Sequence, residues 1–412
     1  MKKGLVQITL LTLITCSFWW LTTLGSQSPF AFALVRLLGA LSLTGFTYTF
    51  YLASRHRLID DYWAGLDKAY IIHRAIGIAA VLLTIVHLIV LVMARISLNS
   101  AVLLKNTWGF PSLILFVLLA VLAVYAKKIE YEKWKLLHKL MIVPFAIGVF
   151  HYYYASRSPF VLNAFNLWMH LINLAGLAFA FYIVFLYDKL AFPYHYKVIS
   201  VKHLSDKTIE LTGEASNKHL KYRAGQFTFI KVALDNEIIP SRPFTISNAF
   251  TDNIIQFTIK NLGDHTARLI EKVKVGDSFY VSQAHGVFDY RQGDDKQLWI
   301  AGGVGIAPFR SFWQTGIDNN FEVDLFYAFY ENDSLYLDEL SKLATKNLKV
   351  HLLNSDKDGF LTVEKIQEVT GIQEKVTVYF CGPEAMRESI LAGFEKQGID
   401  VKLHYEEFDF RS

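Results

Sequence analysis

The sequence predicts two unlike halves: a membrane α-helical bundle, and a soluble module that joins an antiparallel β-barrel to an α/β nucleotide-binding domain. Long apolar runs fill the chain up to about Leu190. From about Tyr194, short strands of alternating polarity are separated by Gly, Asn and Asp turns, which is typical of a small barrel. The last part begins with a glycine-rich turn after a strand and then alternates strands with helices.

Six apolar runs in the first half are long enough to cross a membrane, because about 20 helical residues span a hydrocarbon core of about 30 Å. The first run follows two lysines, as in a signal peptide, but it is too long and no small-x-small cleavage site follows. We therefore expect six spans, at 4–24, 30–53, 69–94, 108–126, 134–155 and 163–187.

Lysine and arginine residues gather in alternate loops of the predicted bundle. With the N-terminus inside, the outer loops hold only Arg95, Lys105 and Arg157. Positively charged loops stay in the cytoplasm, so we expect both termini there, in a multi-pass protein of the plasma (inner) membrane. The same bias explains the net charge of +4, and nucleic-acid binding is not expected.

Four histidines lie inside two of these runs, as two pairs. His73 and His87 are fourteen residues apart in the third run, and His138 and His151 are thirteen apart in the fifth. At about 1.5 Å per residue, either spacing covers about 20 Å, so two imidazoles lie near each membrane surface. Imidazole is a common haem ligand. The pattern predicts two b-type haems, an inner one on His73 and His138 and an outer one on His87 and His151.

A hydrogen bond between helices is the alternative for any single histidine, but it does not require matched depths. The second pair has an awkward geometry. At about 100° per residue, thirteen residues leave two side chains about 140° apart on an ideal helix, whereas fourteen leave them only about 40° apart. Pro144 lies between His138 and His151 and can kink or rewind the helix, which would absorb part of the difference.

Two further polar residues lie in the predicted spans. Arg36 is expected a couple of turns below the outer surface, near the level of the outer histidines. A buried guanidinium requires an anion, and a haem propionate or a bound oxygen species would serve. The equal alternative is an arginine that extends to the outer headgroups. His170 is alone in the sixth span and is expected to be a hydrogen-bonded core histidine.

The barrel region contains two segments suited to FAD, the alternative being a plain barrel. Arg242 offers a bidentate donor for pyrophosphate, Phe244 a flat apolar surface for the isoalloxazine ring, and Thr245 a hydroxyl near its N5 atom. Residues 261–266 then open a helix whose free N–H groups suit phosphate. The expected binding residues are Arg242, Pro243, Phe244, Thr245, Ile246, Ser247, Lys260, Gly263, His265 and Thr266.

The last region is expected to bind NADPH or NADH. Its first strand, 297–301, leads into glycines and a helix, where the backbone can approach a pyrophosphate. Three further strands, 324–329, 350–353 and 376–380, complete a doubly wound sheet. The last strand ends at Cys381, on the edge where such sheets bind ligands, although a buried structural cysteine is the alternative. The expected binding residues are Gly302, Gly303, Gly305, Ile306, Ala307, Pro308, Cys381, Gly382 and Pro383.

Near the C-terminus, Phe408 is placed where it covers the flavin ring or, alternatively, packs onto the core. With the preceding motifs, the chain resembles the NADPH oxidase and ferric reductase superfamily, and it looks most like bacterial NADPH oxidase homologues. The four histidines match the family's bis-histidine pattern. Residues 242–245 match its flavin motif, residues 302–308 its nicotinamide loop and residues 381–383 its hydride-transfer loop. Phe408 resembles an aromatic that stacks on flavin, and Arg36 an arginine near the outer haem of oxidases.

The resemblance implies a ferric-reductase-like membrane domain at 1–190 and a ferredoxin-reductase-like module, with an FAD barrel at 191–292 and an NAD(P)H domain at 293–412. Electrons would pass from cytoplasmic NAD(P)H through FAD and two b-type haems to an acceptor outside. The residues implied in the reaction are Thr245, Cys381, Phe408 and Arg36. O2, giving superoxide, is the leading acceptor and a ferric chelate the alternative. A third reading is a haem-free membrane anchor for a flavin reductase that serves a separate partner. No obligatory protein partner is expected.

Two departures from the family pattern bear on these expectations. Leu91 stands where oxidases commonly carry a further histidine, which weakens the case for superoxide. Tyr330 stands where NADPH-preferring reductases often carry an arginine, although Arg310 or Lys357 could meet a 2′-phosphate. The sequence leaves the choice between NADPH and NADH open.

Overall fold

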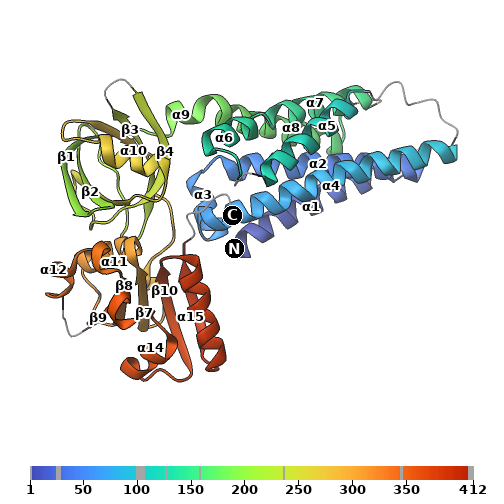
Figure 1. Cartoon of the computed structure of the whole chain (residues 1–412). Coiled ribbons are helices and arrows are strands. Elements are labelled where there is room, and N and C mark those ends of the chain that lie inside the picture. Colours follow the sequence, from blue (N-terminus) through green and yellow to red (C-terminus); the bar gives the residue numbers. More distant parts are fainter. Residues whose placement is uncertain are drawn as a thin grey trace. The chain divides into compact units, whose positions relative to one another are not determined.

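The computed structural model describes residues 2–24, 29–98, 107–125, 128–156, 159–234, 237–343 and 347–406 (Figure 1). The chain divides into two compact units, one that extends to Leu190 and one that begins at Ala191. The first unit is helical. The second contains two β-sheets with associated helices.

Helices of the first unit follow the apolar runs, because such runs satisfy their backbone groups internally when they are helical. Their bounds are α1 Lys2–Thr23, α2 Phe30–Ala53, α3 Arg57–Trp63, α4 Leu66–Leu98, α5 Gly109–Val124, α6 Tyr131–Lys139, α7 Ile142–Ala155, α8 Ala164–Phe181 and α9 Tyr187–Leu190. A π-helical turn, Tyr182–Leu186, joins α8 to α9.

Within the described residues, five of the six predicted spans form segments that are long and apolar enough to cross a membrane. The span predicted at 108–126 is not confirmed. Its helix, α5, has 16 residues, and at about 1.5 Å per residue it covers about 24 Å of a core about 30 Å thick.

The outward side of this unit is apolar. On α8 and the π-helical turn that follows it, exposed large apolar side chains stand three, four or seven residues apart, at Leu167, Leu171, Leu174, Phe181 and Phe185. A continuous apolar stripe of this kind would be unfavourable in water and is typical of a face that contacts lipid. The buried side of the bundle contains a cluster that includes Trp19, Phe46, Phe116, Phe145, Phe165 and Met169.

Helix α2 lies at the centre of the unit and packs along α4, α8 and α1. Small residues allow these close approaches, as is usual between membrane helices. The Ser42 hydroxyl lies 3.0 Å from the carbonyl oxygen of Ala80 on α4 and 2.7 Å from the Thr84 hydroxyl. On α8, Gly176 leaves room for the side chains of Thr47 and Phe145, with which a Cβ atom would overlap.

The fifth predicted span is broken into α6 and α7. Pro144 cannot donate a backbone hydrogen bond, and its ring clashes with the carbonyl of the residue four positions earlier, Leu140. The helix is interrupted at this point. Leu140 and Met141 lie outside both helices, and their N–H groups donate i→i−3 hydrogen bonds, each of 3.1 Å, to the carbonyls of Leu137 and His138. These bonds wind the chain more tightly than an α-helix, and α7 begins after them at Ile142.

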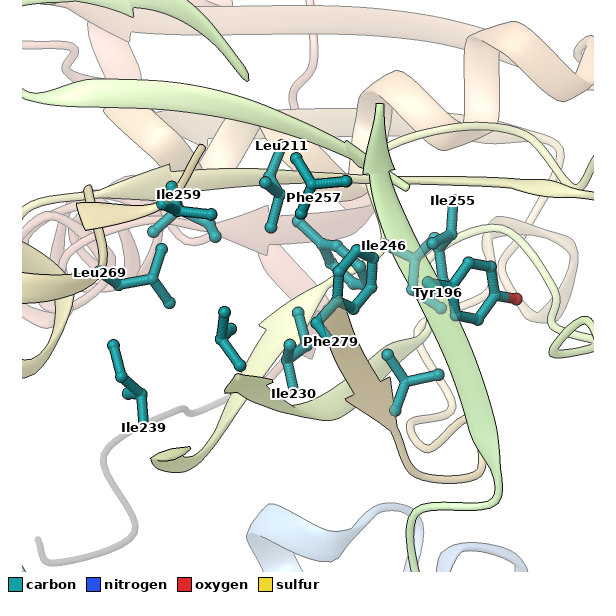
Figure 2. Packing of buried hydrophobic residues seen from close by; sticks show 14 of the residues in the cluster. Tyr196, Leu211, Ile230, Ile239, Ile246, Ile255, Phe257, Ile259, Leu269 and Phe279 are labelled. Atoms are coloured by element: carbon teal, nitrogen blue, oxygen red, sulfur yellow. The ribbon is translucent and has the colours of Figure 1, made fainter. Parts of the chain in front are cut away.

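The second unit starts with a six-stranded antiparallel sheet in the order β4-β3-β6-β1-β2-β5. Figure 2 shows its core, where side chains such as Leu211, Phe257 and Phe279 pack together. The strands are β1 Tyr194–Ser205, β2 Thr208–Ala215, β3 Phe227–Leu234, β4 Glu237–Thr245, β5 Ile254–Lys260 and β6 Ser278–Val281. Five of them lie where strands were predicted. The edge strand β4 was not predicted.

A five-stranded parallel sheet follows, in the order β11-β10-β7-β8-β9. Side chains of β7 alternate between two cores: Leu298 and Ile300 join one, and Trp299 and Ala301 the other. Both faces are therefore covered, as in other parallel sheets. The strands are β7 Lys296–Gly302, β8 Glu322–Phe329, β9 Leu348–Asn354, β10 Lys375–Cys381 and β11 Asp400–Tyr405. The longer helices are α10 Asp264–Lys272, α11 Ala307–Thr315, α14 Val363–Thr370 and α15 Glu384–Lys396.

Candidate functional site

The structure brings the four membrane histidines together in the pairs expected from their depth. The ring centroids of His73 and His138 lie 6.0 Å apart, and those of His87 and His151 lie 6.4 Å apart. A metal–imidazole bond is about 2 Å long, so two imidazoles on opposite sides of one iron have centroids roughly 6 Å apart. Each pair therefore has the separation that bis-histidine ligation requires.

The two histidines of α4 are oriented by backbone carbonyls of α2. His73 Nδ1 lies 2.9 Å from the carbonyl oxygen of Thr49, and His87 Nδ1 lies 2.8 Å from that of Val35. A carbonyl oxygen only accepts, so both Nδ1 atoms carry the proton. The Nε2 atoms then keep their lone pairs, which is the arrangement that usually orients a metal-binding histidine.

The two partner histidines lack such anchors. The Nδ1 atoms of His138 and His151 are buried, and among the described residues neither has a hydrogen-bond partner. The ring of His138 is instead stacked on Trp134, with centroids 5.2 Å apart and planes 13° apart. Packing, rather than hydrogen bonding, holds this ring in place.

Two glycines beside the outer pair were missed by the sequence analysis. A Cβ atom on Gly39 of α2 would lie 3.2 Å from His87 Nδ1, and one on Gly109 of α5 would lie 3.1 Å from His151 Cε1. Both distances are tighter than ordinary contacts, so the rings keep these positions only because the side chains are missing. Glycine inside an apolar span is the only signal that the sequence offers for this role.

The described residues contain no group of three His, Cys, Asp or Glu side chains that would hold a bare metal ion. A haem supplies its own equatorial nitrogens and takes only axial ligands from the protein. The two-residue pairs therefore fit a haem better than a structural or catalytic metal ion.

Arg36 lies one residue after Val35, the α2 residue that accepts from His87. Its guanidinium carbon is 5.3 Å from the ring centroid of Phe165, a cation–π distance. It has no carboxylate partner within the described residues. His170 differs, since its Nδ1 lies 2.8 Å from the Tyr153 hydroxyl and the two rings are stacked, as expected of a core histidine.

The expected FAD residues 242–245 form the end of β4, paired with β3 so that Thr245 lies opposite Phe227. Arg242, Phe244 and Thr245 are half-buried. Just beyond the strand, Ser247 is buried, and its hydroxyl has no hydrogen-bond partner among the described residues. A buried hydroxyl costs free energy unless it is paired, so an additional polar group would be favoured here, as a flavin nucleotide would supply.

The second expected FAD segment lies beside the same strand. Helix α10 begins at Asp264 after Gly263, whose φ of 153° falls in the region that favours glycine. His265 Nε2 lies 2.8 Å from the carbonyl oxygen of Pro240 on β4. The Thr266 hydroxyl accepts from the N–H of Leu262 at 2.9 Å and donates to the Gly263 carbonyl at 3.0 Å. The first turn of α10 is thereby tied to the strand that carries Arg242.

The two expected nucleotide loops pack against each other at the carboxyl ends of neighbouring strands, β7 and β10. A Cβ atom on Gly305 would overlap the carbonyl of Cys381, and one on Gly302 would lie 2.8 Å from Pro383 Cδ. Only glycine permits this approach. Between them Gly303 has a φ of 54°, and the chain turns into α11 at Ala307 and Pro308.

Cys381 faces an apolar environment that keeps its thiol neutral. Burial raises the pKa of this thiol to about 12, and the nearby carboxylate of Glu406 contributes in the same direction. A neutral thiol is a poor nucleophile, which argues against covalent chemistry at this position. Phe408 lies outside the described residues, so its expected place over the flavin stays a prediction.

Lys260, which was expected to contact a cofactor, is paired with Asp333 in the turn after β8, at an Nζ–Oδ2 distance of 2.5 Å. The Asp333 side chain also accepts from the hydroxyls of Ser205 and Thr208, at 2.8 and 3.0 Å. Burial alone would raise the pKa of Asp333, but these donors outweigh it and lower that pKa. The loop after β8 is thereby locked to strands β1, β2 and β5.

Arg310 is buried and forms ion pairs with two carboxylates, Glu339 at 2.8 Å and Glu210 at 3.0 Å. Its guanidinium carbon also lies 4.3 Å from the ring centroid of Tyr336. The suggestion that Arg310 meets a 2′-phosphate is therefore wrong, because the side chain is already surrounded by partners. It links the antiparallel sheet, through Glu210, to the α/β domain.

Comparison with known proteins identifies the parts of the chain. Residues 38–149 match the family model "Ferric reductase like transmembrane component", residues 194–299 match "FAD-binding domain", and residues 299–391 match "Oxidoreductase NAD-binding domain". Together they fit the NADPH oxidase and ferric reductase superfamily. The chain is thus a membrane NAD(P)H-dependent flavin oxidoreductase with a ferric-reductase-like transmembrane part.

Individual relatives match about a third to a half of the chain. The toluate 1,2-dioxygenase electron transfer component of Pseudomonas putida is 27% identical over 232 residues, which are 52% of this chain and 67% of that protein. The carnitine monooxygenase reductase subunit of Escherichia coli K12 is 32% identical over 144 residues, 34% of this chain and 43% of that protein.

Solved structures are similar over half of the chain. A ferredoxin NADP+ reductase from Neisseria gonorrhoeae has a TM-score of 0.44 and 16% identity, covering 51% of this chain and 97% of its own. The FAD/NAD-binding domain of nitric oxide dioxygenase from Vibrio cholerae has a TM-score of 0.42 and 17% identity, covering 52% and 100%.

Proposed function

We propose, from the fit to the NADPH oxidase and ferric reductase superfamily, that this chain transfers electrons from cytoplasmic NAD(P)H through FAD and two b-type haems to an acceptor outside. The proposal rests on the two histidine pairs. Their ring centroids lie 6.0 and 6.4 Å apart, a separation that leaves room for one iron between the two rings. They occur in the same chain as FAD-binding and NAD-binding domains. A membrane anchor alone would not require them.

Bound FAD would supply hydride acceptance and single-electron release, and bound haem would supply one-electron transfer. The protein's part is to bind and orient. Residues 302–308 and 381–383 are proposed to hold the nicotinamide nucleotide, with the Thr245 hydroxyl and the neutral Cys381 thiol at the hydride path. Phe408 is proposed to cover the flavin ring until the nicotinamide displaces it.

His73 and His138 would hold the inner haem, and His87 and His151 the outer one, with both termini in the cytoplasm. With two histidines holding each haem iron, no coordination position would remain for the acceptor. The acceptor is therefore proposed to be reduced without binding to iron, beside Arg36, whose positive charge favours an anionic product.

O2, reduced to superoxide, is the leading acceptor. A ferric chelate is the second candidate, and two observations favour it: the match to the ferric reductase transmembrane component, and Leu91 in place of the further histidine common in oxidases. Both reactions use the same residues up to the outer pair, so only the acceptor distinguishes them.

A reduced-minus-oxidised absorption spectrum of the detergent-purified chain tests the proposal. We expect b-type haem bands and about two haems per chain. Their absence would overturn the electron path and leave an anchored flavin reductase. With haem present, NAD(P)H-driven cytochrome c reduction that superoxide dismutase abolishes indicates the oxidase. Reduction that is insensitive to dismutase, with turnover of a ferric chelate, indicates the reductase.

A further inference from the structure

The order of strands determines which way a dinucleotide lies across the α/β domain. Ligands of such sheets bind outside the carboxyl ends of the strands. The hydride-transfer loop at Cys381 ends β10, and the glycine loop at Gly302 ends its neighbour β7. With the nicotinamide at the first loop and the pyrophosphate at the second, the adenosine half extends over the next strands in the order, β8 and β9.

The ends of β8 and β9 carry carboxylates that are connected to each other. After β8, the N–H of Glu331 donates to Asp356 Oδ2 at 2.8 Å. After β9, the Asn354 side chain accepts from the N–H of Asp356 at 3.0 Å, and the N–H of Asn354 donates to Asp358 Oδ2 at 2.9 Å. These bonds fix three acidic residues at the place where the adenosine ribose is expected.

From this placement we propose that the protein uses NADH in preference to NADPH, and that Glu331 accepts a hydrogen bond from the 2′-hydroxyl of the adenosine ribose. The inference rests on the proposed nicotinamide site. Glu331 is exposed, and its Oε1 pairs with Lys357 at 2.6 Å. Within the described part of the chain, its Oε2 takes no hydrogen bond. A carboxylate at this position matches a hydroxyl donor.

A 2′-phosphate would meet a different environment. It carries about two negative charges at neutral pH and would lie beside Glu331, Asp356 and Asp358. The cations of the described residues in this region are already engaged. Arg310 is buried between carboxylates, Lys260 is paired with Asp333, and Lys365 donates to the backbone carbonyls of Asp358 and Phe360.

Lys357 is the competing recognition element. Its pair with Glu331 is exposed on both sides, and exposed pairs contribute little free energy. The lysine would turn from Glu331 to a phosphate if NADPH were the substrate. The two hypotheses therefore make opposite predictions for the same ion pair. If NADH is preferred, the Glu331 carboxylate contributes to nucleotide binding; if NADPH is preferred, the Lys357 ammonium does.

The test uses the intact detergent-purified protein and measures kcat/KM for NADH and NADPH with ferricyanide, which accepts electrons directly from reduced flavin. Equilibrium binding of NAD+ and NADP+ is measured in parallel. We expect NADH to be favoured, and Glu331→Gln to raise its KM by about ten- to a hundredfold with little change in kcat, as for loss of a charged hydrogen bond. Glu322→Gln is the matched control, because Glu322 lies at the opposite end of the same strand, and it should change neither substrate.

A preference for NADPH that Lys357→Ala abolishes would overturn the inference. So would equal use of both nucleotides with no effect of Glu331→Gln. If neither nucleotide were oxidised, the proposed function would fail, and the binding measurement would still decide between NAD+ and NADP+.

Discussion

The imidazole rings of His87 and His151 lie 6.4 Å apart, with planes at 88°, although His151 was expected to point away from the face that carries His138. The break at Leu140 and Met141 explains the difference. His138 belongs to α6 and His151 to α7, so no single helical projection relates them. Each ring is directed by its own short helix.

Replacing His87 with Ala should remove one haem and leave the other. One axial ligand of the outer pair would be lost, whereas His73 and His138 would be unchanged. We expect haem content to fall from about two to about one per chain and outer-face activity to disappear. Flavin-dependent ferricyanide reduction should persist.

The control for this substitution is His170→Ala, another histidine of the bundle, which is bonded to Tyr153. It should keep both haems. Full haem content in the His87 variant would contradict the ligand assignment.

Gly39→Ala should disturb the outer pair selectively. The new Cβ would lie 3.2 Å from His87 Nδ1, the atom that donates to Val35, so the ring must shift or its hydrogen bond must lengthen. We expect a shifted electron paramagnetic resonance signal from the outer haem and an unchanged inner one. Gly77→Ala on α4 is the matched control, because its nearest neighbour is 3.9 Å away. Identical spectra for the two variants would rule out this role for Gly39.

Arg310→Met should destabilise the reductase half. It leaves the buried Glu210 carboxylate without its cation, and removing one partner of a buried ion pair costs about 3–5 kcal/mol. Urea unfolding of the intact protein, followed by flavin fluorescence, measures the change. Lys357→Met breaks an exposed pair and should cost at most about 1 kcal/mol. Equal effects of both substitutions would show that the Arg310 network contributes no more than a surface pair.

Acid should weaken the contacts of Asp333 with Ser205, Thr208 and Lys260. Its pKa is lowered in the folded state, so its contribution to the free energy of unfolding is complete above the ordinary carboxyl pKa of about 4. That contribution is lost as the pH falls towards the lowered pKa. Urea unfolding at pH 6 and at about pH 3, below the ordinary carboxyl pKa, should show a smaller pH effect in Asp333→Asn than in the unaltered chain. An equal pH effect in both would assign the acid sensitivity to other groups.

The sequence predicted most of the second unit, since five strands of the antiparallel sheet lie where alternation placed them. Strand β4 was not predicted because it contains Pro240 and Pro243, which argue against an interior strand. Proline is compatible with an edge, and β4 is an edge strand. β11, also an edge strand, was not predicted although its charged and apolar residues alternate as in a half-exposed strand.

In the membrane half, the depth of each histidine could be predicted from the sequence, but the direction in which its side chain points could not. Residue spacing fixes height along a helix, so the pairing of the histidines followed from counting. Pro144 signalled a distortion, but the position of the break depends on which carbonyl its ring displaces. The roles of Gly39 and Gly109 depend on rings from other helices, and no local pattern carries that information.

Helix α2 sets the spacing between the two backbone carbonyls that orient the α4 histidines. Thr49 and Val35, the two residues that anchor the α4 rings, are fourteen positions apart, the same number that separates His73 from His87. Insertion or deletion of one residue between Val35 and Thr49 would rotate one anchor by about 100° and uncouple it from its ring. Loops can vary in length without this penalty, so during evolution this stretch should accept substitutions but not a change in its length.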